Sequence, residues 1–568
     1  MFNLSAYAYY LCIKILLMRF FTVLLLVLLT FWARSQDTIY VVLSPFTPGY
    51  QIPQDFAGLS FEKNSLNRGY WGPSKDTLIQ FFKTLQIQSV RIGGNSVDKD
   101  TLSNIATGTR YTVANLDSFY QFIQGAGCQV LHGLNFGGYF NPSLASKEVD
   151  YVTGKYAANM RGFEVGNEPD LYHSNGLRPA NYNVADYDSQ YRVYYDTILF
   201  YNATARLTGP VAATDYTTFT LPFCRDMHGL FTMLTQHYYV AGANSLNNHE
   251  QIINLLNPVH QVSLLTEVNA LVQCADSAAV PFRMAECNSL YNGGQYGVSD
   301  AFASALWALD YMYGLATTGC GGVNFHGGLG GAYTSLAYSN GVYSARPISY
   351  GIMAFNAGSR GRLIPCHVTG NTINLSVYST IDSLNNIYTT VVNKDTLRNA
   401  VMQFNTGNAL YDTAAYITLY ADSLGDTTGV TLGGQTVAAD GTCQPYAWQY
   451  LHVDSGQVQL PVRAGSAVII KFSIDTAAVD TVNTGFKGTK NQGYGLYPNP
   501  AYDRLYVTSP AGMAYALTVF DMFGNAEFTQ TITAPQTLLN ISGLSEGMYF
   551  VRVVNNGSAV YTQKFMKQ

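Results

Sequence analysis

Two glutamates, Glu168 and Glu286, each follow a short apolar segment with the composition of a β-strand. Glu168 lies in the sequence Gly-Asn-Glu-Pro, and Glu286 lies in Met-Ala-Glu-Cys-Asn. Two carboxyl groups about 5–5.5 Å apart can cleave a glycosidic bond with retention, because one protonates the leaving oxygen while the other attacks the anomeric carbon. A single glutamate could instead be a solvated charge in a loop. That explanation fits poorly for a glutamate flanked by an apolar strand, a glycine and a proline. The two glutamates therefore form a candidate catalytic pair.

Eight short apolar or β-branched segments recur along the chain, and segments with helical periodicity separate many of them. Strands that alternate with helices predict a parallel α/β architecture. Eight such units in roughly 270 residues match a (β/α)₈ barrel. The predicted strands are 56–61, 89–92, 129–134, 162–165, 209–213, 233–239, 282–285 and 321–325, and clear helices are 76–85, 116–123 and 301–315.

Polar residues follow all eight predicted strands, at the end where a barrel of this class carries its active site. A single one of them is more simply a capping or turn residue, but eight at one end are hard to attribute to capping alone. In chain order they are Glu62, Asn95, Asn135, Asn167 with Glu168, Asp215, His237 with Tyr239, Glu286, and Asn324 with His326.

The segments around the glutamates resemble the clan of retaining (β/α)₈ glycosidases, and within it glycoside hydrolase family 79, the β-glucuronidase and heparanase family. The resemblance covers about residues 56–350 and implies that Glu168 is the acid/base and Glu286 the nucleophile. The matching segments are 91–96 (RIGGNS), 133–137 (GLNFG), 163–172, 286–294 (ECNSLYNGG) and 322–328 (GVNFHGG).

The same resemblance implies roles for the residues around the pair. Asn167 would bind the sugar 2-hydroxyl, and His237 and Tyr239 would line the site, with Tyr239 orienting Glu286. The carboxylate of a uronic acid would be bound by tyrosine hydroxyls and by backbone N–H groups, which can approach it closely where the residue is glycine. The alternative is that the glycines only make a turn. The residues implied to bind the carboxylate are Tyr291, Gly293, Gly294 and Tyr333. Glu62 and Asn95 would contact other parts of the sugar.

The chain divides into six predicted parts. Residues 1–35 are typical of a signal peptide, with Met18 as an alternative start and an uncleaved membrane anchor as the alternative reading. Residues 36–50 supply a strand that joins a β-sandwich, 51–345 form the barrel, 346–474 form the sandwich, and 475–493 are a linker. Residues 494–568 resemble the C-terminal sorting domain of type IX secretion cargo, the alternative being a small carbohydrate-binding sandwich. The resemblance implies the secretion machinery as a partner and a secreted or cell-surface location.

The composition of the chain excludes some classes of partner and cofactor. Charged residues make up 12% of the chain, the net charge is −5 and basic blocks are absent, which argues against a nucleic-acid partner. No other segment after the leader is long and apolar enough to span a membrane stably. Seven cysteines follow Cys12 without CxxC spacing, so we predict no metal site and no cofactor, with one disulfide left open.

Four functions remain open at this stage. The first is an exo-acting retaining β-glucuronidase that releases glucuronic acid or its 4-O-methyl form from glycans. The others are an endo-acting enzyme on a polymer containing glucuronic acid, an enzyme for a neutral β-glycoside, and an inactive barrel that binds surface glycans. Both Glu168 and Glu286 are present within intact motifs, which argues against the inactive barrel.

Overall fold

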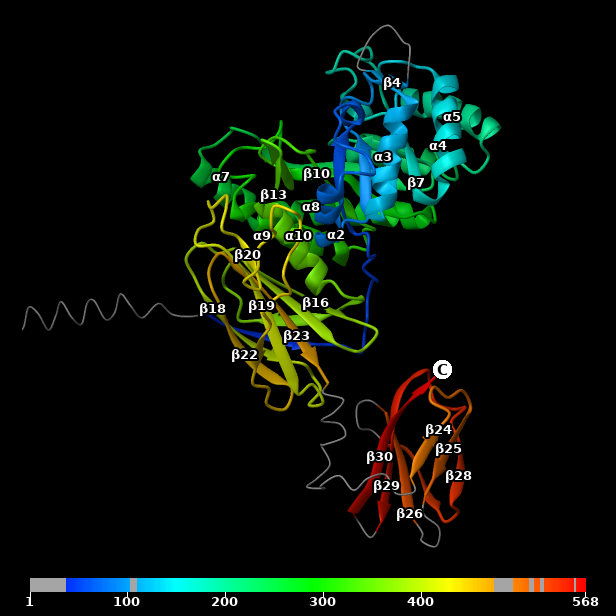
Figure 1. Cartoon of the computed structure of the whole chain (residues 1–568), viewed down its shortest axis with the longest axis vertical. Coiled ribbons are helices and arrows are strands. Elements are labelled where there is room, and N and C mark those ends of the chain that lie inside the picture. The colour runs from blue at the N-terminus through cyan, green and yellow to red at the C-terminus, as the bar shows by residue number, and fades with distance from the viewer. Residues whose placement is uncertain (1–36, 103–109, 475–493, 510–514, 522–525, 556–557) are drawn as a thin grey trace, which may run out of the picture. The chain divides into compact units, whose positions relative to one another are not determined.

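The computed structural model describes residues 37–102, 110–474, 494–509, 515–521, 526–555 and 558–568 (Figure 1). The predicted signal peptide and the predicted linker lie outside the described residues. The chain divides into two compact units, the first holding the barrel with most of the sandwich and the second holding the C-terminal region. Among the described residues, no helix combines the length and the apolar character needed to cross a bilayer.

A closed parallel barrel of eight strands forms the centre of the first unit (Figure 1). This confirms the predicted (β/α)₈ fold, and the strand order around the barrel is β10-β11-β2-β3-β6-β7-β8-β9. The strands are β2 (Ala57–Glu62), β3 (Ser89–Gly93), β6 (Gln129–Leu134), β7 (Met160–Val165), β8 (Leu207–Ala212), β9 (Leu234–Gly242), β10 (Phe282–Tyr291) and β11 (Val323–His326).

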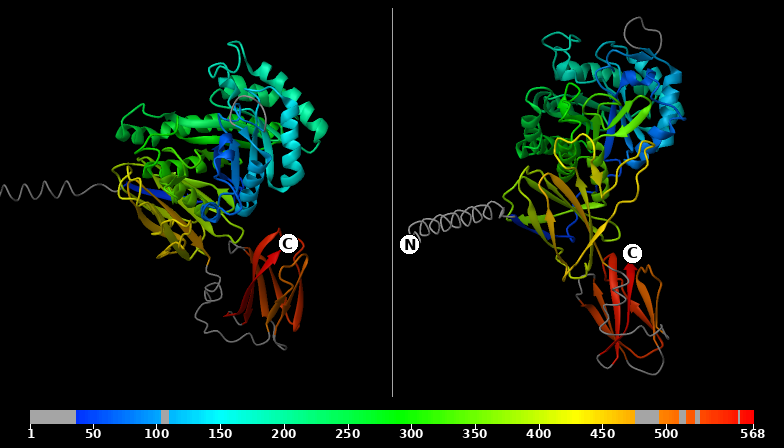
Figure 2. Two further views of the ribbon diagram at one scale, coloured as in Figure 1. Left: turned by 45° about the horizontal axis from the view of Figure 1, so that its top comes forward. Right: turned by 60° about the vertical axis from the view of Figure 1, so that its left-hand side comes forward.

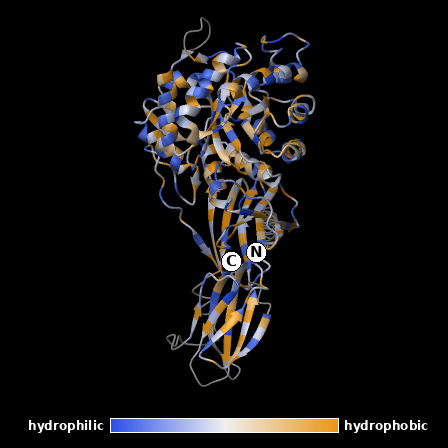
Figure 3. Ribbon diagram, turned by 90° about the vertical axis from the view of Figure 1, so that its right-hand side faces the viewer, coloured by the Kyte–Doolittle hydropathy of each residue, from blue (hydrophilic) through white to orange (hydrophobic). Residues whose placement is uncertain are grey.

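Helices follow each barrel strand and cover the outside of the barrel. Figure 3 shows long apolar runs on the central strands, whereas the outer helices mix apolar and polar residues, as expected for helices that bury one face. The helices are α2 (Asp76–Thr84), α3 (Val113–Ala126), α4 (Pro142–Tyr156), α5 (Val184–Tyr201), α6 (Leu221–Asp226), α7 (Asn248–Leu255), α8 (Pro258–Ser277), α9 (Phe302–Thr317) and α10 (Pro347–Gly358). Short additional elements are η1 (Lys63–Asn67), η2 (Ala157–Asn159), η3 (Pro169–Leu171), η4 (Tyr216–Thr220), β4 (Thr101–Leu102), β5 (Arg110–Tyr111), β12 (Leu336–Ser339) and β13 (Val342–Ala345).

Helix α10 corrects the predicted boundary between barrel and sandwich. The all-β region was expected from residue 346, but Arg346 is the N-cap of α10, and the first sandwich strand after it begins at Arg362. Eleven of the twelve residues of α10 are buried, so it lacks the alternation of apolar and polar residues that identifies a surface helix. Pro347 at the first helical position was the available signal.

The sandwich packs two sheets, ordered β15-β1-β18-β22 and β14-β16-β17-β23-β19-β20, with β21 also pairing β19. The N-terminal strand β1 (Asp37–Leu43) pairs antiparallel with β15 and parallel with β18, and it appears in blue among the yellow sandwich strands in Figure 2. The other strands are β14 (Arg362–Ile364), β15 (Cys366–Thr369), β16 (Leu375–Ile381), β17 (Ile387–Asn393), β18 (Ala400–Asn405), β19 (Thr413–Tyr420), β20 (Thr431–Leu432), β21 (Gln449–Leu451), β22 (Gln457–Val462) and β23 (Ser466–Ser473).

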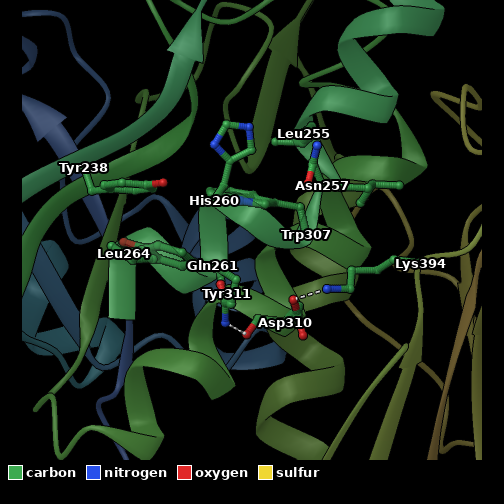
Figure 4. Close-up of a pocket in the computed structure, with 11 residues that line it drawn as sticks. Tyr238, Leu255, Asn257, His260, Gln261, Leu264, Trp307, Asp310, Tyr311 and Lys394 are labelled. Carbon is green, nitrogen blue, oxygen red and sulfur yellow. Dashed lines mark hydrogen bonds and ion pairs between the residues drawn. The ribbon is translucent and has the colours of Figure 1, made fainter. Parts of the chain in front are cut away.

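A buried ion pair joins the barrel to the sandwich (Figure 4). Asp310 on α9 accepts from Lys394 Nζ at 2.5 Å and from the Tyr378 hydroxyl at 2.8 Å. The pocket beside this pair, between Tyr238 and Tyr311, measures about 10 Å³, which leaves room for about one water molecule. The contact therefore serves to dock the two domains.

The C-terminal unit is a small all-β structure with its own apolar core, which includes Leu505, Val519 and Val551. Its two sheets are ordered β24-β25-β28 and β27-β26-β29-β30. The strands are β24 (Gly495–Tyr497), β25 (Arg504–Thr508), β26 (Tyr515–Asp521), β27 (Ala526–Ile532), β28 (Gln536–Asn540), β29 (Gly547–Asn555) and β30 (Ser558–Lys567).

One disulfide forms between Cys224 on α6 and Cys274 on α8, two helices on the outside of the barrel. The other described cysteines are free, and Cys128, Cys287 and Cys320 are buried. The disulfide that the sequence left open is thus present, and most thiols pack as small apolar side chains.

A buried charge cluster anchors the segment that follows β2. Lys63 Nζ donates to Glu148 Oε1 on α4 at 2.8 Å, lies 2.7 Å from His132 Nε2 and donates to the Gly133 carbonyl at 2.6 Å. The Tyr111 hydroxyl donates to Glu148 as well. Burial by itself raises the pKa of the Glu148 carboxyl, but Lys63 and His132 outweigh burial and lower the pKa to about 2. Because Lys63 directly follows Glu62, this cluster holds the end of β2 in place.

We expect Lys63→Met to lower the free energy of unfolding by about 3–5 kcal/mol, because it leaves the Glu148 carboxylate buried without its cation. Urea unfolding of the full chain, followed by circular dichroism, measures the change. The control is Lys155→Met, which removes an exposed ammonium paired with Asp117 and should leave the midpoint almost unchanged. Equal midpoints for the two variants would show that the buried cluster contributes nothing to stability.

Candidate active site

The two glutamates meet at the C-terminal mouth of the barrel. Glu168 follows β7 and Glu286 lies in the outer half of β10. One carboxylate oxygen from each, together with a ring nitrogen of His237, lies within 4.8 Å of the others. Glu286 is 5% exposed, and the side chain of Glu168 is 12% exposed. The structure therefore brings together the pair that the sequence singled out, at a separation near that of a retaining glycosidase.

The backbone at Glu168 has a left-handed conformation, with φ of 52°, that is uncommon outside glycine. The Glu168 N–H donates to the Val211 carbonyl at 3.0 Å. The Asp170 carboxylate accepts the N–H groups of Ala213, Thr214 and Asp215, at 2.8, 3.0 and 3.3 Å. These bonds tie the end of β7 to the end of β8, so the unusual conformation is imposed by the neighbouring strand.

Extra residues in two strands aim the glutamates. The register of β10 against β9 shifts between Met284 and Glu286, and that of β8 against β9 shifts between Pro210 and Ala212. The residues inserted at the two shifts, Ala285 and Val211, share a small buried apolar cluster. A bulge of this kind re-aims the side chain next to it, and here Glu286 immediately follows one.

Three donors surround the Glu286 carboxylate. Arg91 Nη1 donates to Oε2 at 2.6 Å, the Tyr239 hydroxyl donates to Oε1 at 2.7 Å, and His326 Nδ1 lies 3.4 Å from Oε2. Burial by itself raises the pKa of this carboxyl, but His326, His237 and Arg91 lower it well below its usual range. Glu286 is therefore ionised at neutral pH, the state that a nucleophile requires.

Arg91 on β3 connects the groups around the pair. Its guanidinium is fully buried and donates to Glu164 Oε2 at 2.5 Å and to Asn167 Oδ1 at 2.9 Å, as well as to Glu286 and the Ser60 hydroxyl. Two buried carboxylates thus share one guanidinium, which also orients the Asn167 amide. Sequence reasoning missed this role of Arg91 and Glu164, although both stand out as charged residues within apolar strand segments.

His237 and Asn95 complete the surroundings of Glu168 and Asn167. His237 Nδ1 lies 3.0 Å from Glu168 Oε1, and His237 is 1% exposed. The Asn167 side-chain amide donates to Asn95 Oδ1 at 3.3 Å. Cys287, next to the second glutamate, donates its thiol to the Asn324 carbonyl at 3.6 Å, and burial raises its pKa, so it stays protonated.

Glu62 and His326 form a second ionic contact at the mouth. His326 Nε2 lies 3.6 Å from Glu62 Oε1, and the Ser96 N–H donates to Glu62 Oε2 at 2.8 Å. Burial lowers the pKa of His326, and Arg91 does so to a lesser extent, but the carboxylates of Glu286 and Glu62 raise it above its usual value overall. The imidazole therefore stabilises the fold at pH values below its unfolded pKa, and this contribution is lost as the pH rises through the folded pKa.

We expect Glu62→Gln to move the pKa of His326 back toward that of an ordinary histidine, because one of the two carboxylates that hold its proton is neutralised. NMR titration of the full chain with labelled histidine measures this, and the His326→Gln variant assigns the signal. Titration of His326 below the usual value in the unmodified protein, or no change in Glu62→Gln, would contradict the assigned charge contacts.

The predicted carboxylate-reading loop lies beside Tyr239. The rings of Tyr291 and Tyr333 lie 6.4 and 6.3 Å from the Tyr239 ring, centroid to centroid. The Tyr333 N–H donates to the Gly293 carbonyl at 3.4 Å. A side chain at Gly294 would collide with Tyr333, with a Cβ only 2.8 Å from the Tyr333 nitrogen, and its φ of 78° also favours glycine. Tyr291 and Tyr333 therefore lie beside Tyr239, the tyrosine that donates to Glu286.

Three of the polar residues that follow predicted strands make structural contacts instead of joining this cluster. Asn135 accepts the Tyr139 N–H, and Asp215 caps η4 by accepting the Thr218 N–H. The Asn324 side chain bonds Arg283 at 2.7 Å in the barrel interior. The capping or turn explanation therefore holds for Asn135 and Asp215, whereas Asn324 packs inside the barrel as the acceptor of a buried arginine.

Glu168, His237 and Glu286 are the described side chains that could hold a cation together. The Arg91 guanidinium 2.6 Å from Glu286 opposes a second positive charge there. Glu168 is also already bonded to His237. The donor set fits a metal poorly, and the expectation of no metal or cofactor stays a prediction.

The fold is that of a (β/α)₈ barrel with an attached β-sandwich, and comparisons with known proteins agree. The chain is similar to the crystal structure of a 4-O-α-L-rhamnosyl-β-D-glucuronidase from Fusarium oxysporum 12S in complex with Rha-GlcA, with a TM-score of 0.63 and 18% identity over 75% of this chain and 98% of that one. It is also similar to a GH51 arabinofuranosidase from Xanthomonas axonopodis pv. citri, with a TM-score of 0.60 and 14% identity over 77% of this chain and 100% of that one.

Two relatives share sequence as well. The chain is 25% identical over 300 residues to a β-glucuronidase of Aspergillus niger, covering 43% of this chain and 52% of the relative. It is 29% identical over 191 residues to a β-glucuronidase of Neurospora crassa, covering 30% of this chain and 34% of the relative. The chain thus spans about half the length of the first relative and about a third of the second. The predicted resemblance to glucuronidases is confirmed.

The C-terminal region has a separate assignment. Residues 495–568 match the family described as secretion system C-terminal sorting domain. This confirms the predicted sorting domain and indicates a protein exported to the cell surface or beyond it.

Proposed function

We propose that this chain is a retaining β-glycosidase, and that its substrates are β-glucuronides. The observation that carries the proposal is the pair of carboxylates at the barrel mouth, the buried Glu286 and the partly exposed Glu168, with oxygens within 4.8 Å of each other. Sequence similarity to two β-glucuronidases supports the substrate class.

In the first step, a Glu286 oxygen attacks the anomeric carbon while the bond to the leaving oxygen breaks and Glu168 transfers its proton to that oxygen. In the second step, Glu168 accepts a proton from water, whose oxygen attacks the anomeric carbon and releases Glu286. Arg91 and Tyr239 orient the Glu286 carboxylate, and their hydrogen bonds lower its pKa. Asn167, which is held by Arg91 and Asn95, would bind the sugar 2-hydroxyl.

The uronic carboxylate would be bound by the loop beside Tyr239. Tyr291 and Tyr333 carry the hydroxyl donors, and Gly293 and Gly294 allow backbone N–H groups to approach an anion. Glu62 and Asn95 would contact sugar hydroxyls. For the exported chain, we further propose that the C-terminal sorting domain is the part that binds the secretion machinery.

Hydrolysis of an aryl β-glucuronide beside the matching aryl β-glucoside tests this function, with the anomer of the first-formed sugar followed by NMR. We expect turnover of the glucuronide with retention, and kcat/KM for the glucoside at least about a hundredfold lower, because the loop would lack its carboxylate partner. Preference for the glucoside would remove the roles of Tyr291, Gly293, Gly294 and Tyr333. Turnover of neither would refute an exo-acting glucuronidase and favour an endo-acting enzyme or a binding protein.

A further inference from the structure

A groove of about 560 Å³ lies between α7 of the barrel and three loops of the sandwich. Ile253 and Gly297 line it on the barrel side, and Tyr420, Asp422 and Arg463 line it on the sandwich side. Yellow loops of the sandwich reach toward α7 in Figure 1. Its volume lies in the range of sites that hold small ligands, about 300–1,000 Å³.

The sandwich wall presents an arginine on an aromatic ring. The Arg463 guanidinium lies 4.8 Å from the centroid of the Tyr420 ring, and the Tyr420 hydroxyl donates to Asp422 Oδ1 at 2.9 Å. Arg463 is exposed, and within the described part of the chain no carboxylate pairs with it. Stacking on the ring fixes the plane of the guanidinium and leaves its N–H edge free to bind a carboxylate in bidentate geometry.

The groove adjoins the loop that follows the nucleophile strand. Gly297 contacts Asn248 of α7 so closely that a Cβ on it would lie 2.2 Å from the Asn248 amide nitrogen. Tyr296, which precedes it, is 65% exposed, and the Arg346 guanidinium lies 6.0 Å from its ring centroid. Arg346 also donates to the Gly331 carbonyl, two residues before Tyr333. A second arginine–tyrosine pair is thus formed by Tyr296 of this loop and Arg346 at the N-cap of α10.

We propose that this groove is a second binding site, outside the catalytic cleft, for a glycan chain that carries uronic acid residues. The choice of a uronic acid as the bound sugar rests on the proposed function. Arg463 would bind a uronate carboxylate, and the exposed Ile253 side chain on the opposite wall would contact the apolar face of a sugar ring. A neutral chain would leave the guanidinium without a partner. A densely sulfated chain would meet Asp422 and a protein of net charge −5.

Affinity electrophoresis of the full chain in 4-O-methylglucuronoxylan, beside the same polymer with its carboxyl groups reduced, tests the proposal. We expect Arg463→Ala to bind the native polymer about tenfold more weakly, since a hydrogen bond to a charged group is lost, with Arg463→Lys in between. Ile253→Asp, which places a carboxylate on the opposite wall, should weaken binding as well. The matched control is Arg192→Ala, an exposed arginine on α5 away from the groove, which should bind as the unmodified protein does.

The reduced polymer should bind the unmodified protein, Arg463→Ala and Arg192→Ala equally and weakly. Retardation of Arg463→Ala and Ile253→Asp equal to that of the unmodified protein would overturn the site, and so would an equal loss by Arg463→Ala on native and reduced polymer. Hydrolysis of an aryl β-glucuronide separates this result from the proposed function, because a small substrate does not reach the groove. We expect kcat/KM of Arg463→Ala for that substrate to stay within about twofold of the unmodified value; a larger loss would show that Arg463 acts on the catalytic cleft and would overturn a separate site.

Discussion

Replacing Glu286 by glutamine should lower kcat/KM for an aryl β-glucuronide by about 10⁴-fold or more, because the covalent step loses its nucleophile. The amide keeps the size of the side chain and can still accept from Tyr239, so folding should be preserved. Steady-state kinetics on protein with unchanged circular dichroism measures the effect. The matched control is Glu250→Gln, an exposed glutamate on α7 that should retain full activity.

The smaller variant Glu286→Gly makes the role of the residue visible in the product. Azide can occupy the space of the missing carboxylate and attack the anomeric carbon directly, so we expect an α-glycosyl azide from an activated β-glucuronide. A β-glycosyl azide, or undiminished hydrolysis by Glu286→Gln, would show that Glu286 is not the nucleophile.

Glu168→Gln should lower kcat/KM by about 10²–10⁴-fold for substrates with poor leaving groups, because the leaving oxygen is no longer protonated. A dinitrophenyl glucuronide needs little acid assistance, so its glycosylation step should be nearly unaffected and the glycosyl-enzyme should accumulate. Pre-steady-state release of the phenolate measures that step as a burst. Azide should then accelerate turnover and give the β-glycosyl azide, since Glu286 still forms the intermediate.

Equal losses for dinitrophenyl and alkyl glucuronides would show that Glu168 does not act as the acid/base. The outcome also tests the His237 contact, because His237 lies 3.0 Å from Glu168 Oε1. If His237 acts by positioning that carboxyl group, His237→Gln should lower kcat/KM more for the alkyl than for the dinitrophenyl glucuronide, as Glu168→Gln does but to a smaller extent.

Much of the barrel could be predicted because its signals are local. Short apolar segments separated by helical periodicity located seven of the eight strands to within about three residues, whereas β10 runs to Tyr291, six residues beyond its predicted end. Parallel strands in a barrel bring their C-terminal ends to one mouth. Glu168 and Glu286 could therefore be placed near each other, although 118 residues separate them in the sequence. Helix α10 could not be found in this way, because a helix buried on nearly every side has no polar face.

The connections between the site residues depended on the tertiary structure. Arg91 is one charge within a strand in the sequence, and nothing local shows that its guanidinium joins Glu164, Glu286 and Asn167. The bulge at Ala285 is equally invisible, since it is defined by the register of β10 against β9. The pairing of Cys224 with Cys274 likewise depends on how α6 and α8 pack, over a separation of 50 residues.

The sequence by itself determined the class of fold, the two carboxylates and the separate sorting domain, because periodicity and short motifs are properties of neighbouring residues. Only the tertiary structure decided which charges lower the pKa of Glu286, how the backbone at Glu168 is held, and where Arg463 meets Tyr420 at a groove. Each of these depends on side chains far apart in the sequence reaching within a few ångströms of one another, and short-range electrostatics and packing act only at such distances.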